Sequence, residues 1–271
     1  MQGRLSTPIN DRIQAFPHNS WEDEFQQAKK LGFNTIEWIV DERSNPIFDD
    51  EKIDVILKIS QNNGIEINSL CADIFMNDYL FKSPENIIEK NLKILEQLIR
   101  QCQKCHIKIL ELPFVDSSSL KNSKHQQQIL KNLKSIISCA EECNVILGLE
   151  TDLEPKTFLN LLEKFNHPNI KANYDIGNSV SNNFITSEEL ETLKNWIVNI
   201  HVKDRLMHGK TVPLGSGDVN FDNFFQKLRD IDYTGDLIIQ GARENFSDKI
   251  NPELTCLKYL EFVNRYLEKR I

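Results

Sequence analysis

Six polar or charged side chains lie at or near the ends of short apolar runs, where a strand buried on both faces would offer only hydrophobic residues. They are Glu37, Glu111, Glu150, Asp175, His201 and Gln240. Taken singly, each could be a helix cap or a loop hydrogen-bonding group. If the strands close into a parallel barrel, however, their carboxyl ends meet on one face, which is where such barrels build active sites.

This set of side chains is suited to holding a cation. Carboxylates that cluster in a partly buried site repel one another and resist ionisation unless a positive charge lies among them. Carboxylate oxygens, one imidazole and an amide oxygen suit Mn²⁺, Mg²⁺, Co²⁺ or Zn²⁺ about equally. We therefore expect one divalent metal ion at the carboxyl ends of the strands.

The elements that would position these residues alternate along the chain. Seven runs rich in β-branched and apolar residues predict strands at 35–40, 66–70, 107–112, 145–150, 170–175, 197–202 and 237–240. The segments between them carry apolar residues at helical spacing. With a short strand expected at 2–5, this makes eight βα units and predicts a single (β/α)8 TIM barrel domain over 1–271. The alternative is an open doubly wound sheet, but no glycine-rich phosphate loop follows the first strand.

Composition limits the partners. The formal charge of −8 and the pI near 5.4 argue against a nucleic-acid partner, because such binding draws on clustered Lys and Arg. No apolar run approaches the roughly 18 residues that would predict a membrane span, and no basic-then-apolar signal opens the chain. We expect a cytoplasmic protein that binds a small polyhydroxylated substrate, with a homo-oligomer as one option for its assembly.

Several ordered motifs resemble a known family. They are MQGRLS at 1–6, GLET at 148–151, NYDIGNS at 173–179, HVKDR at 201–205, PLGSGDVNF at 213–221 and IIQGAR at 238–243. In order and spacing, over essentially the whole chain, they resemble the sugar phosphate isomerase/epimerase family of xylose isomerase-like TIM barrels. Members include tagatose 3-epimerase, hydroxypyruvate isomerase and inosose dehydratase.

The resemblance implies four metal ligands, and the chain departs from the family at two positions. The implied ligands are Glu150, Asp175, His201 and Gln240. The epimerases have a second glutamate at the last position, whereas Gln240 can coordinate through its carbonyl oxygen but cannot act as a base. At Asn178 many relatives carry a histidine that contacts substrate, and an asparagine cannot shuttle a proton near neutral pH.

The chemistry that the resemblance implies is isomerisation or epimerisation of a small sugar, sugar phosphate or related polyhydroxy carbonyl compound. A base would abstract a proton to form a metal-bound enediolate, and Glu150 is the expected base. One base suffices for isomerisation on one face, so isomerisation is the more economical hypothesis. Epimerisation needs a second acid, for which Lys203 is the best candidate because it lies two residues after His201 on the same side of the strand. Lys203 could instead form a salt bridge to a neighbouring carboxylate.

The remaining expectations concern substrate contacts and other functions. We expect substrate contacts from Glu37, Glu111, Asn178, Arg205 and Arg243. Arg205 and Arg243 could instead be structural partners of Asp204 and Glu244. Three other functions are considered: a lyase that dehydrates a keto-inositol-like compound, a barrel that binds sugars without catalysis, and an endonuclease, which the acidic balance and the scarcity of strand-end histidines disfavour.

Overall fold

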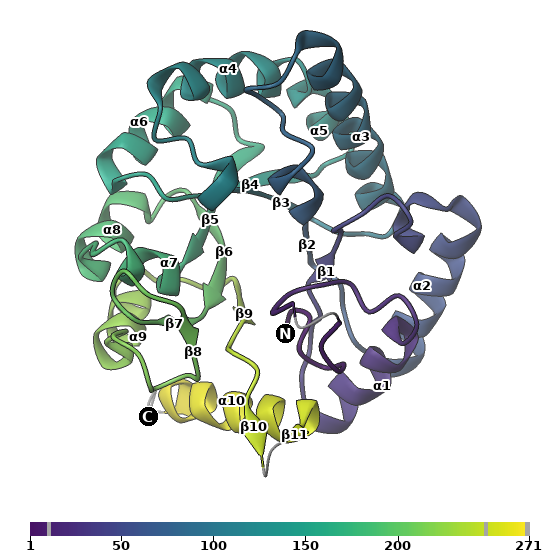
Figure 1. Ribbon diagram of the computed structural model, residues 1–271, viewed down its shortest axis with the longest axis vertical. Coiled ribbons are helices and arrows are strands. Elements are labelled where there is room, and N and C mark those ends of the chain that lie inside the picture. The colour runs from purple at the N-terminus through teal and green to yellow at the C-terminus, as the bar shows by residue number, and fades with distance from the viewer. Residues whose placement is uncertain (10–11, 247–248, 269–271) are drawn as a thin grey trace.

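The centre of the molecule is a parallel sheet that curls into a ring, with helices around its outside (Figure 1). The computed structural model describes residues 1–9, 12–246 and 249–268. Seven strands pair in the order β1-β2-β3-β4-β5-β6-β9. Their bounds are β1 Trp38–Ile39, β2 Ser69–Cys71, β3 Ile109–Phe114, β4 Ile146–Thr151, β5 Ile170–Asp175, β6 Ile197–Val202 and β9 Asp236–Ile239. Sequential strands are therefore neighbours in space, as βα units require.

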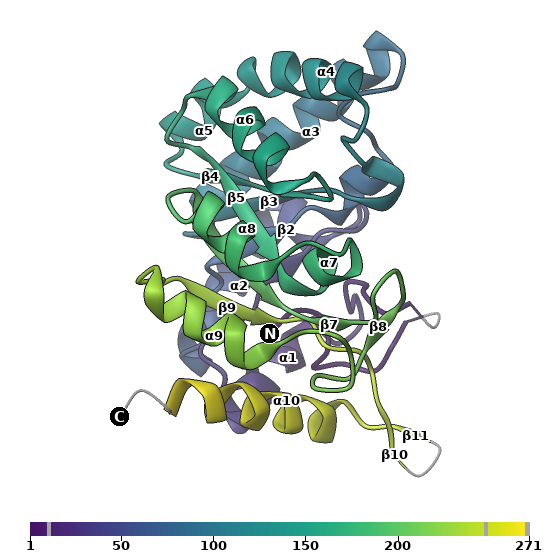
Figure 2. The same ribbon diagram turned by 90° about the vertical axis from the view of Figure 1, so that its left-hand side faces the viewer.

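The helices cover the outer face of this sheet (Figures 1 and 2). They are α1 Trp21–Leu31, α2 Asp50–Asn63, α3 Glu85–Lys104, α4 Ser123–Lys134, α5 Ile137–Glu142, α6 Pro155–Phe165, α8 Thr186–Leu193, α9 Phe221–Asp230 and α10 Pro252–Leu267. The short helix α7 Ile176–Ser181 lies instead at the carboxyl end of β5, inside α8 and against β6. In α3, for example, Ile94, Leu95, Leu98 and Ile99 are buried at helical spacing. None of the described helices is long and apolar enough to cross a membrane.

The barrel fold expected from the sequence is confirmed, with differences at the strand ends. β5 and β6 have the predicted bounds. β2 begins and ends later than the predicted strand at 66–70, because residues 66–68 lie at the start of the barrel, where only Glu66 makes a bridge, to Thr35. The strand therefore reaches further toward the site than its apolar pattern indicated.

Residues 2–5 close the ring without forming a regular strand. The Gln2 N–H donates to the Ile239 carbonyl at 3.2 Å, and the Glu37 N–H donates to the Met1 carbonyl at 3.0 Å, so the segment lies between β9 and β1. Gly3 has a φ of 55°, a left-handed conformation that interrupts an extended chain. The expected first strand thus has the expected place but a bent backbone.

Arg4 joins this segment to the last strand. It is 1% exposed. Its Nε donates to the Gly241 carbonyl at 2.9 Å, and its Nη2 donates to the Gln240 carbonyl at 3.2 Å. Its Nη1 donates to the Gln2 carbonyl at 3.1 Å. The guanidinium therefore supplies hydrogen bonds at the one seam where regular strand pairing is missing.

Small elements at the carboxyl ends of the strands shape the mouth of the barrel. They are the β7–β8 hairpin (Asp204–Arg205 with Thr211–Val212), the β10–β11 pair (Asn245–Phe246 with Lys249–Ile250) and three 3₁₀ turns at Pro46–Phe48, Asp73–Met76 and Asp116–Ser118. The Asp204 carboxylate accepts N–H donors from Gly215, Gly217 and Val219 and so holds the loop 213–219. A Cβ at Gly217 would come within 2.2 Å of Asp204 Oδ1, so this turn requires glycine.

We predict that Arg4→Met lowers the free energy of unfolding by about 2 to 4 kcal/mol, because three buried carbonyls lose a charged donor. Urea denaturation monitored by circular dichroism measures this change. Arg12→Met is the control, since the Arg12 side chain is 52% exposed and its ion pair with Asp41 should contribute less than about 1 kcal/mol. Equal losses in the two variants would contradict the proposed role of Arg4 at the seam.

Candidate metal and substrate site

Glu150, Asp175 and His201 converge inside the mouth of the barrel. They come from β4, β5 and β6, which are consecutive neighbours in the sheet. His201 Nδ1 lies 3.6 Å from Glu150 Oε2 and 3.9 Å from Asp175 Oδ2. One ligand atom from each residue lies within 4.8 Å of the other two, and all three residues are buried. This spacing suits coordination of one ion by two carboxylates and an imidazole.

Asp175 has a structural task as well. It is the N-cap of α7, and its Oδ1 accepts the Asn178 N–H at 2.8 Å. Its Oδ2 accepts from the Lys203 ammonium at 2.7 Å. Burial alone would raise the pKa of Asp175, but the charges of Lys203 and His201 outweigh burial and hold that pKa below its usual value. The carboxylate is thus ionised and presents Oδ2 to the interior.

Lys203 forms the salt bridge that the sequence left as an alternative role. Its ammonium contacts Asp175, and its side chain is 15% exposed, toward the cavity. Burial acts to lower the pKa of Lys203, but Asp175 and Glu150 raise it above its usual value. Gly177 makes room for the lysine stem, because a Cβ there would lie 2.8 Å from Lys203 Cγ. A positive charge is therefore built into the carboxylate cluster.

Asn178 links Glu150 to Arg205. The Asn178 amide nitrogen donates to Glu150 Oε1, and its amide oxygen accepts from Arg205 Nη1 at 2.8 Å. Arg205 also donates from Nε and Nη2 to the Gly209 carbonyl. Because an amide both donates and accepts, Asn178 orients the predicted base without carrying charge.

The side-chain amide of Gln240 has its nitrogen engaged in a hydrogen bond and its oxygen free. Its Nε2 donates to Gln2 Oε1, while its Oε1 is buried and has no hydrogen-bond partner in the described part of the chain. A buried amide oxygen without a donor is an acceptor that a cation would satisfy. Gln240 therefore stays a predicted fourth ligand whose free oxygen fits that role.

Several of these side chains line a cavity of about 390 Å³, whereas Asp175 and His201 lie behind its wall. Glu150, Lys203 and Gln240 line it together with three of the predicted substrate contacts, Glu111, Asn178 and Arg205. A second cavity, of about 380 Å³, lies at the opposite end of the strands and is lined by residues such as Thr35 and Asp236. The first cavity lies at the carboxyl ends of the strands, where barrel enzymes carry their chemistry, and the second does not.

Two predicted substrate contacts lie elsewhere. Glu37 is 1% exposed and hydrogen-bonded below the cavity, which it does not line. Arg243 donates to the carbonyls of Gly3, Ser6 and Ile13, and so holds the N-terminal loop. Neither the Arg205–Asp204 nor the Arg243–Glu244 pair is formed among the described residues within salt-bridge distance. Substrate contact by Glu37 and Arg243 remains a prediction without geometric support.

Other residues of the cavity wall were not predicted. They are chiefly Arg4, Arg12, Gln14, Asp41, Cys71 and Asp73. Gln14 Nε2 and Cys71 Sγ both donate to the Asp73 carboxylate, which burial gives a raised pKa. Asp73 lies two residues after the end of β2 at Cys71. Because the predicted strand ended at residue 70, Asp73 was not recognised as a polar residue at a strand end. Arg12 and Gln14 lie outside regular elements, where no periodicity points to them, and Arg4 lies in the segment 2–5, which was predicted as a strand but not as part of the site.

Comparisons with known proteins agree with the barrel fold and with the motif resemblance. A family model described as a xylose isomerase-like TIM barrel matches residues 25–262. L-ribulose-5-phosphate 3-epimerase UlaE from Escherichia coli O1:K1 / APEC is 26% identical over 241 residues, which cover 84% of this chain and 84% of that protein. A solved D-tagatose 3-epimerase-like protein superposes with a TM-score of 0.77 at 16% identity, covering 98% of this chain and 96% of that one. D-psicose 3-epimerase from Clostridium cellulolyticum H10 gives 0.72 at 16%, covering 91% and 93%.

We predict that Lys203→Met destabilises the metal-free protein by about 3 kcal/mol, because Asp175 loses its buried partner. The same change should tighten divalent metal binding, since the ammonium competes with a cation for Asp175. Urea denaturation in chelator and isothermal titration with Mn²⁺ measure the two effects. Lys121→Met is the control, because it removes only the ion pair between an exposed lysine and Asp152. The free energy of unfolding and the Mn²⁺ affinity should both hardly change in this variant. Weaker metal binding in Lys203→Met would contradict Asp175 as a ligand.

Proposed function

The chain belongs to the xylose isomerase-like TIM barrel family, and from that premise we propose that it is a divalent-metal-dependent isomerase or epimerase of a small sugar or sugar phosphate. The observation that carries the proposal is the convergence of Glu150, Asp175 and His201, of which Glu150 also lines the carboxyl-end cavity. The free Gln240 oxygen supports a fourth ligand. A divalent cation held there would polarise a substrate carbonyl and its neighbouring hydroxyl, which makes the proton between them more acidic.

Glu150 is the proposed base. It lines the cavity, and the Asn178 amide holds its Oε1 while Oε2 faces His201. A carboxylate held in this way can remove an α proton from a substrate carbon and return it to the neighbouring carbon. That sequence accounts for isomerisation without a second group.

Lys203 is the proposed second proton-transfer group. Gln240 has no proton to give, whereas the Lys203 ammonium lines the same cavity and keeps its proton beside Asp175. The relatives with similar sequence and structure are named as 3-epimerases, which favours inversion of one carbon over isomerisation. We therefore place epimerisation first, with Glu150 and Lys203 as the two proton carriers.

The position of Arg205 favours a substrate with an anionic substituent. It lines the cavity, and no carboxylate lies within salt-bridge distance of it in the part of the chain that the structure describes. Its remaining N–H groups can bind phosphate oxygens in a forked arrangement. Because the UlaE proteins are named for a ketose 5-phosphate, we propose a pentulose phosphate ahead of a free sugar.

We predict that the metal-loaded protein exchanges a substrate α hydrogen with deuterated water, and that Glu150→Gln reduces the exchange by at least about 10³-fold because no other base replaces it. NMR over a panel of ketoses, inososes and their phosphates measures both exchange and product. Phosphorylated ketoses should exchange faster than free ones. Control variant Glu154→Gln alters only the cap of α6 and should retain exchange.

The products separate the remaining functions. An inverted C3 centre supports epimerisation, an aldose supports isomerisation, and loss of water from an inosose would replace the proposal with dehydration. If no member of the panel exchanged at all, the catalytic proposal would fail in favour of a sugar-binding barrel.

A further inference from the structure

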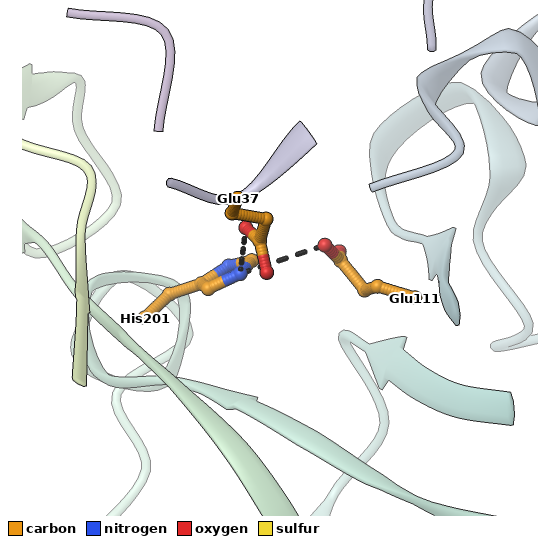
Figure 3. Close-up of side chains that lie close together, drawn as sticks. All are labelled: Glu37, Glu111 and His201. Carbon is orange, nitrogen blue, oxygen red and sulfur yellow. Dashed lines mark ion pairs between the residues drawn. The ribbon is translucent and has the colours of Figure 1, made fainter. Parts of the chain in front are cut away.

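A second buried cluster lies on the other side of His201 (Figure 3). His201 Nε2 is 2.9 Å from Glu37 Oε1 and 3.5 Å from Glu111 Oε2. All three side chains are fully shielded from solvent. Barrel interiors are normally filled with branched aliphatic side chains. Two carboxylates beside an imidazole in this layer therefore need a physical reason.

Glu37 is held for one task. Its Oε2 accepts from Ser69 Oγ at 2.6 Å and from Asn199 Nδ2 at 2.8 Å. Asn199 Nδ2 is itself oriented by a bond of 2.7 Å to the Asn173 amide oxygen. These two donors occupy Oε2. Oε1 has no hydrogen-bond partner among the described residues and lies 2.9 Å from His201 Nε2. The carboxylate is thus fixed through Oε2, with a free oxygen beside one ring nitrogen.

Glu111 is not held in this way. Neither of its carboxyl oxygens has a hydrogen-bond partner among the described residues. Burial, together with the charges of Glu150 and Glu37, raises the pKa of Glu111 well above its usual value. Glu37 Oε1 lies nearer to His201 Nε2 than Glu111 Oε2 does, at 2.9 Å against 3.5 Å, and Glu37 is held by two hydrogen bonds, so Glu37 is the better placed of the two to accept the Nε2–H.

The two nitrogens of His201 therefore face different partners. Nδ1 faces Glu150 and Asp175, and Nε2 faces Glu37. Asn173 Nδ2 lies 3.3 Å from one nitrogen and 3.4 Å from the other. Because these distances are nearly equal, the amide lies against the ring and is in line with neither lone pair. A histidine that ligates a metal through one nitrogen commonly donates its other N–H to a carboxylate, which sets the tautomer.

We propose that Glu37 is a positioning residue that accepts the Nε2–H of His201 and so keeps the Nδ1 lone pair directed at Glu150 and Asp175. This inference rests on the proposed metal-dependent function. It moves Glu37 from the substrate-contact role expected from sequence to support of a ligand. A competing arrangement is a second cation between Glu37, Glu111 and Nε2, whose ligand atoms also lie within 4.8 Å of one another. That arrangement requires an unprotonated Nε2, so the two cannot hold together.

The test measures metal binding, not activity. We expect Glu37→Gln to weaken Co²⁺ binding by about 10- to 100-fold, as loss of such an outer carboxylate does elsewhere. Glu111→Gln is the matched comparison, because it makes the same change beside the same nitrogen at 3.5 Å in place of 2.9 Å, and it should weaken Co²⁺ binding less than Glu37→Gln does. Ser69→Ala removes one bond that fixes Glu37 and should produce a smaller loss in the same direction. Equal losses in the two glutamate variants, or none in Glu37→Gln, would overturn the proposal.

A measurement on the unmodified protein covers the case in which a variant fails to fold. In ¹⁵N NMR of the Zn²⁺-loaded protein with labelled histidine, His201 should carry its proton on Nε2 and the metal on Nδ1. A metal on Nε2, or two metal ions per chain, would overturn the inference while leaving a metal-dependent enzyme intact. Absence of metal binding in the unmodified protein would overturn both the inference and the proposed function.

Discussion

The burial of several carboxylates around the single imidazole of His201 is the constraint on which the site depends. Like charges in a poorly solvated interior cannot all remain ionised without a cation or a proton among them. Three features reduce the repulsion between these carboxylates. The Lys203 ammonium pairs with Asp175, burial raises the pKa of Glu111, and Glu37 faces an imidazole nitrogen. A divalent cation beside Nδ1 would complete the balance at Glu150 and Asp175.

The barrel makes this arrangement possible because it directs neighbouring strands to one point. Glu150, Asp175 and His201 need only be placed at the ends of β4, β5 and β6 to meet. Below them, Ser69 of β2 and Asn199 of β6 donate hydrogen bonds to Glu37. Residues from two separate strands therefore orient the Glu37 carboxylate. The seam closed by residues 2–5 then brings the Gln2 side chain against Gln240.

The sequence predicted what periodicity and strand ends can encode. β5 and β6 had the right bounds: their sequences, IKANYD and IVNIHV, are rich in apolar residues and have a polar residue at or next to the last position. It did not reveal that Glu37 lies below the cavity or that Arg243 bonds to backbone carbonyls, because those contacts join segments far apart in the chain. Asp73 was missed because β2 extends beyond its apolar pattern, and Gln14 because it lies in an irregular loop.

The most direct measurement is anomalous X-ray diffraction at the zinc edge from crystals grown with Zn²⁺. The proposed site predicts a single strong peak about 2 Å from Nδ1 of His201 and from carboxylate oxygens of Glu150 and Asp175. Two results would contradict the central claim that the carboxyl ends of β4, β5 and β6 form a metal centre. One is an anomalous map without an ordered peak in the barrel mouth, and the other is a peak between Glu37, Glu111 and Nε2 of His201.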